Sequence, residues 1–401
     1  MNAICSACGS TAPSGTPYSC PLCGGALLLQ YERPDGNWNK GARQGIWKYA
    51  ALLPNVPASS RIELGEGGTP LVRSVSLGKR LGIEQLYFKY EGGNPTGSYK
   101  DRIAAMGVSW ALAQGKAACI GTSSGNAGAA AAAYAARAKL PYHLFVLENM
   151  AEAKLAQVLA YGADVRKVVG FGYSPEVGEE VFDRVVAASK EHNWEIMVTA
   201  FRFNPYAMEG VKTIAYEIAE QLGEAAAARV YSPAGGGGLY VGIWKGFDEL
   251  SRLGLATGKP HMVAVQPDGC SNIARAYKLG EKHPAPGPAT SRISGLQVPN
   301  PPDGEAALAL MAAGDGSSVS VADGDIYTAQ RMLAEEEGIF CEPAGATALA
   351  GLIRERDNGR TFDSGPVVCI VSGVGFKDGA SVEEMVKDRD VPLLEAAALG
   401  I

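Results

Sequence analysis

Four cysteines near the N-terminus have the spacing of a metal-ligand set. Cys5 and Cys8 lie in CSAC, Cys20 and Cys23 lie in CPLC, and eleven residues separate the two pairs. Two such pairs can place four thiolates tetrahedrally around zinc. The alternative is a pair of disulfides, which is typical of small secreted modules, and the N-terminus lacks the basic and apolar segments of a signal peptide. We therefore predict a structural zinc site formed by these four cysteines.

Lys100 lies in a glycine- and proline-rich turn, EGGNPTGSYKDR, immediately before a predicted helix. An isolated lysine is ordinarily a solvated surface residue. Its ε-amine can, however, form a Schiff base with an aldehyde cofactor when a site is built around it. The neighbouring loops decide between these two interpretations.

Three further loops follow predicted strands and have unusual sequences. GTSSGNAG, residues 121–128, precedes an alanine-rich helix whose first N–H groups favour an anion such as a carboxylate, although Asn126 alone would also suit a simple helix cap. SPAGGGGLYVG, residues 232–242, has four consecutive glycines whose N–H groups can wrap a phosphate. SGVGFKD, residues 372–378, places Ser372 directly after a predicted buried strand.

One ligand, pyridoxal phosphate, accounts for all four loops. It needs a lysine amine for its aldehyde, a cup for its phosphate, and partners for its O3′ hydroxyl and its ring nitrogen. A nucleotide loop is excluded because no Gly-Lys-Ser or Gly-Lys-Thr follows the four glycines. We therefore predict pyridoxal phosphate as the cofactor and Lys100 as its Schiff-base lysine.

The elements that position these loops alternate along the chain. The predicted strands are 86–90, 117–121, 142–147, 163–169, 195–200, 229–234, 261–267 and 366–373. The predicted helices are 101–115, 126–138, 151–161, 175–191, 208–222, 238–253, 325–338 and 343–356. This alternation is typical of the α/β class, with parallel sheets covered by helices on both faces. Ligands of such folds bind at the carboxyl ends of the strands.

Composition narrows the class of protein. The chain has 401 residues, 47% of them hydrophobic and 19% charged, which is typical of a compact globular protein. The net charge of −6 argues against binding to nucleic acid or to an anionic membrane, although a zinc ribbon can bind either a nucleic acid or a protein. No apolar stretch is long enough to span a bilayer. We expect a cytoplasmic protein that acts on a small molecule.

Taken in order, the motifs resemble those of the threonine synthase family of fold-type II pyridoxal-phosphate enzymes. CSAC…CPLCGG is similar to the N-terminal zinc ribbon of many members. The other similar segments are GEGGTPLVR (65–73), NPTGSYKDR (94–102), GTSSGNAG (121–128), NPYAMEGVKT (204–213), AGGGG (234–238), EPAGATALAGL (342–352) and SGVGFKD (372–378).

The resemblance implies a tryptophan synthase β-like fold with two parallel-sheet domains and the cofactor in the cleft between them, plus the small N-terminal zinc ribbon. The implied domains are a ribbon at 1–32, a linker and the first part of the large domain at 33–99, a small mobile domain at 100–200, and the large cofactor-binding domain at 201–401. The family also implies a homodimer.

The resemblance also assigns roles to individual residues. Lys100 is the Schiff-base lysine and the general base, Asn126 bonds O3′, and Ser372 faces the ring nitrogen. The phosphate is held by Gly235, Gly236, Gly237 and Gly238. The substrate's α-carboxylate, that of a small amino acid, is held by Thr122, Ser123, Ser124 and Gly125.

Two departures concern the substrate. The family has an arginine and an asparagine that hold the phosphate of O-phosphohomoserine, and Ala207 and Phe201 occupy these positions here. Arg202, Lys212 and Arg292 are cations that could compensate. Threonine synthase remains the leading hypothesis. The alternative is a relative that performs β-replacement or β-elimination on O-phosphoserine, serine or threonine, similar to cysteate synthase or an ammonia-lyase. A third hypothesis is a non-enzymatic interaction protein built on this scaffold.

Overall fold

The computed structural model describes residues 2–13, 18–34, 38–39, 45–123, 125–148, 150, 152–171, 174–223, 227–362 and 365–395. The strands are β1 (Asn2–Cys5), β2 (Thr11–Pro13), β3 (Leu27–Gln30), β4 (Leu71–Arg73), β5 (Leu86–Tyr90), β6 (Cys119–Thr122), β7 (Tyr142–Leu147), β8 (Asp164–Val168), β9 (Glu195–Ile196), β10 (Arg229–Pro233), β11 (His261–Pro267), β12 (Gly316–Val321) and β13 (Val367–Val371). The α-helices are α1 (Leu77–Leu81), α2 (Lys100–Ala113), α3 (Asn126–Ala138), α4 (Glu152–Ala160), α5 (Pro175–Glu191), α6 (Pro205–Met208), α7 (Thr213–Gln221), α8 (Gly238–Arg252), α9 (Asn272–Leu279), α10 (Gly304–Leu310), α11 (Asp323–Glu337), α12 (Pro343–Asp357) and α13 (Gly379–Val386).

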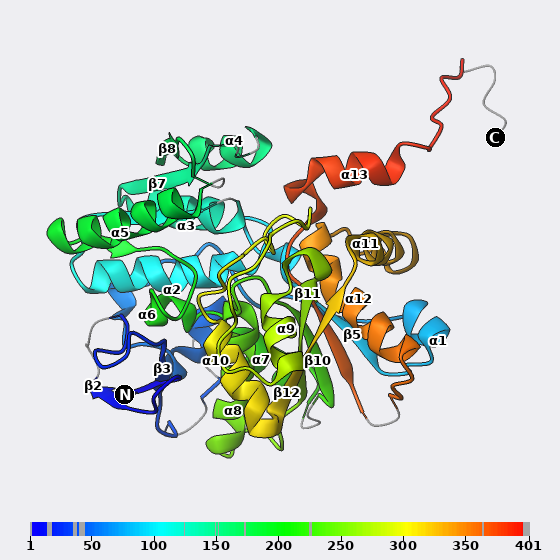
Figure 1. Ribbon diagram of the computed structural model, residues 1–401, viewed down its shortest axis with the longest axis horizontal. Helices are drawn as coiled ribbons and strands as arrows, with labels where there is room; N and C mark the ends of the chain where they lie inside the picture. Colours follow the sequence, from blue (N-terminus) through cyan, green and yellow to red (C-terminus); the bar gives the residue numbers. More distant parts are fainter. Residues whose placement is uncertain are drawn as a thin grey trace.

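The described residues form three sheets flanked by helices (Figure 1). Their strand orders are β2-β1-β3, β8-β7-β6-β9 and β12-β11-β10-β13-β5-β4. Within the two larger sheets all neighbouring strands are parallel except β4, which pairs antiparallel with β5. The predicted α/β class is therefore confirmed.

The N-terminal sheet is antiparallel and lies below α2 and α6 in Figure 1. Its two CxxC turns each end at a glycine with positive φ, Gly9 at 69° and Gly24 at 71°. In each turn this glycine's N–H donates to the carbonyl of the first cysteine, at 3.0 Å to Cys5 and 2.8 Å to Cys20. The left-handed glycine conformation closes both turns and brings the two pairs of thiols to the same end of the sheet.

The four-stranded sheet is covered by an alanine-rich helix. Residues 129–135 of α3 are all buried, and α3 packs against α2, α4 and β7. Small side chains let the helix lie close to its neighbours on several sides, which explains why a helix with so little amphipathic pattern is stable here.

The six-stranded sheet has two packed faces, and β13 lies near its centre. Val367, Cys369 and Val371 pack in a core with residues of α11 and α12. Val368 and Ile370 pack in the opposite core with residues of α7 and α8. Since successive side chains of a strand point to opposite faces, an uninterrupted apolar run is what a strand covered on both faces requires.

Two predicted elements differ from the structure. The strand predicted at 195–200 is limited to Glu195–Ile196, because the chain leaves β6 after Met197 donates to the Ile120 carbonyl at 2.7 Å. The helix predicted at 208–222 begins only at Thr213, as α7, because residues 209–212 form a turn that separates it from α6. A side chain at Gly210 would lie 2.1 Å from the Arg102 carbonyl oxygen, so the chain passes directly over the backbone of α2 at this break.

Several elements were not predicted, among them α1, β4, α9, α10, β12 and α13. In β12 the sequence GSSVSV offers little apolar pattern, and its outer edge has no neighbouring strand among the described residues.

None of the described helices combines the length and the apolar character that crossing a bilayer requires.

Candidate active site

Lys100 is the first residue of α2 and lies in the turn that follows β5. Its Nζ donates to Thr199 Oγ1 at 2.8 Å and lies 4.6 Å from the centroid of the Tyr99 ring. Sequence reasoning missed Thr199. The available signal was its position near the carboxyl end of a predicted strand, where ligand-binding side chains gather. The Thr199 hydroxyl orients the amine of Lys100, and Lys100 is half-buried.

The residues that follow Lys100 anchor it. Asp101 accepts from the backbone N–H and the hydroxyl of Thr96, at 3.1 and 2.9 Å, and burial raises the pKa of Asp101 to about 7. Arg102 is fully buried and bonds both Glu91 and Glu217 in two-pronged contacts of 2.6 to 2.8 Å. Paired charges with this many hydrogen bonds fix the first turn of α2.

Glu217 joins the same buried network to a second cation. It accepts from Lys89 Nζ at 2.6 Å as well as from Arg102. Burial by itself would raise the pKa of Glu217, but the two cations, Arg102 first, outweigh it and hold this pKa at about 2. The carboxylate therefore remains charged across the physiological pH range.

The glycine loop lies between β10 and α8. Gly237 has φ of 94°, and a side chain there would lie 2.9 Å from the Asp303 carbonyl oxygen. A side chain at Gly235 would lie 3.0 Å from the Gly295 carbonyl oxygen. The loop is therefore packed closely against the segment 295–303. Among the described residues, no protein acceptor is found for the N–H groups of the four glycines. A cradle of unbonded N–H groups at a helix start fits a phosphate.

Asp303 joins this glycine loop to the turn that carries Thr199. Its carboxylate accepts from the N–H groups of Phe201 and Arg202, at 2.9 and 3.1 Å, and its own N–H donates to the Gly236 carbonyl at 2.9 Å. Burial raises the pKa of Asp303 to about 7. Sequence reasoning did not single out this residue, which lies in an irregular proline-rich segment.

The start of α3 carries the predicted carboxylate-binding residues. Thr122 ends β6, and Ser123 Oγ accepts from the N–H groups of Gly125 and Gly128, at 3.1 and 2.8 Å. The Ser123 hydroxyl thus acts as a cap of the helix start. Ser124 lies outside the described residues.

Asn126 donates from Nδ2 to Glu342 Oε1 at 2.8 Å. Glu342 is buried, and its N–H donates to the Gly373 carbonyl at 3.1 Å. Burial raises the pKa of Glu342 to about 7, although Lys154 and Lys377 act in the opposite direction. The motif that contains Glu342 was recognised in the sequence, but its link to Asn126 was not.

Ser372 lies directly after β13 and is buried. Its carbonyl accepts from the Tyr99 N–H at 3.1 Å, one residue before Lys100. Since β5, β10 and β13 are parallel strands of one sheet, their carboxyl ends lie at one edge. This edge brings Lys100, the glycine loop and Ser372 together, and the Asn126–Glu342 contact joins the start of α3 to them.

These residues fit pyridoxal phosphate. The lysine amine, the cradle of N–H groups and the Ser372 hydroxyl are what its aldehyde, phosphate and ring nitrogen require. The glycine cradle is the decisive feature, because a Cβ at these positions would collide with the segment behind the loop.

The two positions at which this chain lacks the family's asparagine and arginine lie in the core. Phe201 and Ala207 are buried, and Lys212 lies in a fully buried ion cluster with Glu209 and Glu249, at 2.6 and 2.9 Å. Lys212 therefore cannot reach a substrate. The other two cations named from the sequence, at positions 202 and 292, are exposed.

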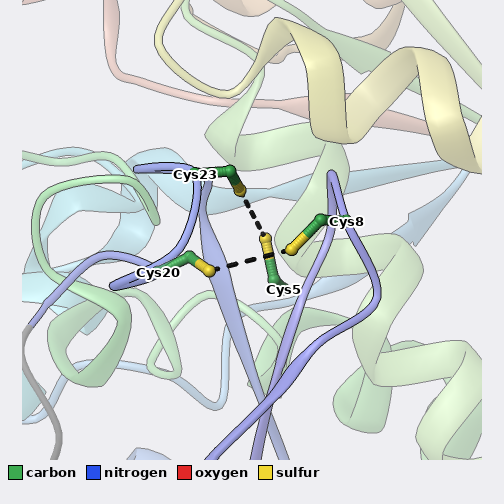
Figure 2. A group of neighbouring side chains, drawn as sticks. All are labelled: Cys5, Cys8, Cys20 and Cys23. Carbon is green, nitrogen blue, oxygen red and sulfur yellow. Dashed lines mark hydrogen bonds between the residues drawn. The ribbon is translucent and has the colours of Figure 1, made fainter.

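The N-terminal cysteines form a compact cluster (Figure 2). Their sulfur atoms all lie within 4.8 Å of one another, with Cys5 and Cys23 3.5 Å apart and Cys8 and Cys20 3.8 Å apart. Two thiolates on a tetrahedral zinc with bonds of about 2.3 Å lie about 3.8 Å apart. The cluster can therefore hold a metal ion.

Comparisons with known proteins identify the family of the chain. A family model described as pyridoxal-phosphate dependent enzyme matches residues 62–373. A threonine synthase of Methanocaldococcus jannaschii is 37% identical over 384 residues, covering 93% of this chain and 92% of the relative. A threonine synthase of Methanosarcina acetivorans is 35% identical, covering 96% and 95%.

The solved structure of maize serine racemase has a TM-score of 0.66 and 24% identity to this chain, covering 80% of it and 92% of the racemase. That likeness shows the predicted fold-type II architecture. The chain therefore belongs to the threonine synthase family of pyridoxal-phosphate-dependent enzymes.

Proposed function

We propose that this chain is a threonine synthase, which converts O-phosphohomoserine and water into threonine and phosphate. The relatives of 35–37% identity across more than nine-tenths of the chain carry this name. The single structural observation behind the proposal is the convergence of Lys100, the glycine loop and Ser372 at one edge of the large sheet.

Bound pyridoxal phosphate supplies an electron sink for the charge that develops when a proton leaves an amino acid's α-carbon. In our proposal Gly235, Gly236, Gly237 and Gly238 donate their N–H groups to its phosphate. Ser372 offers a hydroxyl to its ring nitrogen, and Asn126 bonds its O3′ hydroxyl. A hydroxyl in this place leaves the nitrogen unprotonated, which suits elimination and replacement reactions.

Lys100 is the proposed general base. Its Nζ accepts a proton from the substrate's α-carbon and moves protons at the β-carbon, while Thr199 Oγ1 keeps the amine in place. The substrate's α-carboxylate is bound by the loop of Thr122, Ser123, Ser124 and Gly125, through the hydroxyls of Ser123 and Ser124 and neighbouring N–H groups.

The proposal includes a small domain, residues 100–200, that closes on the substrate and excludes water. Lys377 Nζ, which follows β13, donates to Gln157 Oε1 of α4 at 2.7 Å. Lys154 of the same helix donates to the Ser294 hydroxyl. These contacts join the two sides of the cleft and support closure as part of the reaction.

We also propose that the cysteine cluster holds a structural zinc ion, that the enzyme is a homodimer and that it works in the cytoplasm. The support for zinc is the spacing of the sulfur atoms and the absence of an open ligand position in a four-thiolate set.

A substrate panel tests the proposal. The holoenzyme receives O-phosphohomoserine, O-phosphoserine, serine or threonine separately, and free phosphate, keto acids and amino acids are measured. We expect phosphate and threonine from O-phosphohomoserine, and none from a Lys100→Ala variant. The burial of Phe201 and Ala207, where the family has phosphate ligands, gives the alternative a specific basis. Turnover of O-phosphoserine or serine without turnover of O-phosphohomoserine would replace our proposal by that alternative.

A further inference from the structure

A cavity of about 30 Å³ lies beside the start of α3, and its walls include Gly125, Asn126, Lys154 and Lys377. This volume holds roughly two water-sized oxygen atoms. Its polar wall comes from the two lysines, Asn126 and Gln157, and Ala129 and Phe376 form an apolar part. Gly125 belongs to the proposed carboxylate loop and Asn126 to the proposed cofactor site, so the cavity adjoins the reacting part of a bound substrate.

Two lysines from opposite sides of the cleft meet there. Lys154 comes from α4 in the small domain, and Lys377 comes from the short helix η6 (Gly375–Lys377) after β13. The charge of Lys154 contributes to lowering the pKa of Lys377, after the larger effect of burial. Glu342 and Asp101 act on Lys377 in the opposite direction. Both lysines line the same cavity, so an anion bound there would face two positive charges.

Both ammonium groups are held by neutral partners. Lys154 donates to the Ser294 hydroxyl, and Lys377 donates to the Gln157 side-chain carbonyl at 2.7 Å. Among the described residues, neither forms an ion pair. The two carboxyls whose charges act on Lys377 have other hydrogen-bond donors: Glu342 accepts from Asn126, and Asp101 accepts from Thr96. An oxyanion that displaced the neutral partners would form stronger, charge-assisted bonds.

Of the other cations near the site, Arg202 is exposed and its charge acts on Asp303. Ala207 stands where the family has an arginine, and it is buried. Lys212 is paired with Glu209 and Glu249 in the core. Lys154 and Lys377 are therefore well placed to supply the positive charge that a doubly charged leaving group requires.

We propose that Lys154 and Lys377 form a subsite for an oxyanion of the substrate, either the phosphate of the leaving group or the α-carboxylate. The inference rests on the proposed function for the identity of the substrate, but not for the presence of an anion site. It names the residues that replace the missing arginine.

The test measures binding and does not depend on turnover. The probes are a phosphonate analogue of O-phosphohomoserine, whose carbon–phosphorus bond cannot be eliminated, and L-norvaline, which lacks the phosphonate. Each is titrated into holoenzyme by calorimetry and by the change in cofactor absorbance. The variants are Lys154→Met and Lys377→Met, with Lys167→Met as a control, because Lys167 is exposed in the same small domain as Lys154.

We expect each cleft variant to bind the phosphonate about 10- to 100-fold more weakly, the usual cost of losing one charged hydrogen bond. The control is expected to bind as the wild type does, and Lys154→Arg is expected to restore part of the affinity. A loss for the phosphonate alone assigns the subsite to the leaving group. An equal loss for norvaline assigns it to the α-carboxylate.

Unchanged affinity for both probes in both folded variants would overturn the inference. Unchanged melting temperature and cofactor absorbance establish that the variants are folded and loaded. If the wild type makes no threonine but binds the phosphonate through these lysines, the proposed function fails and the subsite stands.

Discussion

At the scale of single residues, the site depends on side chains that hold other groups in place. Thr199 orients the amine of Lys100, Asp303 fixes the turn that carries Thr199, and Glu342 holds Asn126. None of these three contacts was predicted, although Glu342 lies in a motif that was recognised in the sequence. Each acts through a contact between segments about 100 residues or more apart, which no local pattern reveals.

Thr199→Val tests the first of these contacts. Removing the hydroxyl leaves the Lys100 amine without its acceptor, so we expect kcat to fall roughly 10-fold while the cofactor remains bound. Steady-state kinetics and the cofactor absorbance of the purified enzyme measure both effects. Thr328→Val changes an exposed threonine of α11 in the same way and serves as the control. Equal kcat values for the two variants would contradict this role.

Glu342 gives a pH-dependent prediction. Its folded pKa of about 7 lies above the ordinary value of 4.5, so the folded state binds more protons than the unfolded state between these values. The stability contribution of the neutral carboxyl is complete below about pH 4.5 and is lost as the pH rises through 7, at up to about 1.4 kcal/mol per pH unit. Lys154, Lys377 and Asp378 are the charges that act on it.

Glu342→Gln keeps the acceptor for Asn126 and removes this titration. We expect the variant to gain stability relative to the wild type as the pH rises from 5 to 8, as measured by urea unfolding at each pH. Glu383→Gln, an exposed position on α13, is the control. A difference in stability that stays constant across this range would show that Glu342 does not titrate there.

At the scale of elements, the sequence predicts the helices and strands whose ends are marked by local signals. α3, α5, β5, β7 and β11 have the predicted bounds, because helix starts, apolar runs and turn residues mark them. The break between α6 and α7 was missed because it depends on Gly210 lying against the backbone of α2. The strand predicted at 195–200 was too long because its hydrogen bonds to β6 end early, where the chain turns toward Thr199.

The glycine loop offers a test at this scale. Gly237→Ala introduces a side chain at φ of 94°, where it would meet the Asp303 carbonyl oxygen at 2.9 Å. We expect a cost of about 1–3 kcal/mol, seen as a lower affinity for pyridoxal phosphate and a lower melting temperature.

Gly324→Ala is the matched control, because no atom lies within 4 Å of the added methyl group in α11. Cofactor affinity is measured by titrating the cofactor-free protein. Equal cofactor affinity in Gly237→Ala and the control would show that phosphate binding does not depend on the close packing behind the glycine loop.

At the scale of the whole molecule, the N-terminal ribbon contacts residues in and beside the larger sheets. The Tyr18 hydroxyl donates to Glu195 Oε2 at 2.8 Å in β9 of the four-stranded sheet, and the Tyr18 ring meets Tyr206 edge-on. Tyr31, just after β3, covers the buried Lys212 at 3.7 Å from the ring centroid. The order of the ribbon is therefore coupled to the order of both larger sheets.

Metal removal tests this coupling. We expect about one zinc ion per chain, and we expect its removal by a chelator to lower the melting temperature by several degrees, because the contacts of Tyr18 and Tyr31 loosen with the ribbon. Elemental analysis and thermal unfolding before and after restoring zinc provide the measurement. A metal-free protein that melts at the same temperature would contradict the coupling.

The central claim is that this enzyme makes threonine by removing phosphate from carbon and adding water at the neighbouring carbon. The most direct measurement incubates the holoenzyme with O-phosphohomoserine in ¹⁸O-labelled water and determines the label in both products by mass spectrometry. We predict threonine with ¹⁸O in its hydroxyl and phosphate without label, because the substrate's carbon–oxygen bond breaks and the new hydroxyl comes from water. Labelled phosphate with unlabelled homoserine, or no threonine at all, would contradict the claim.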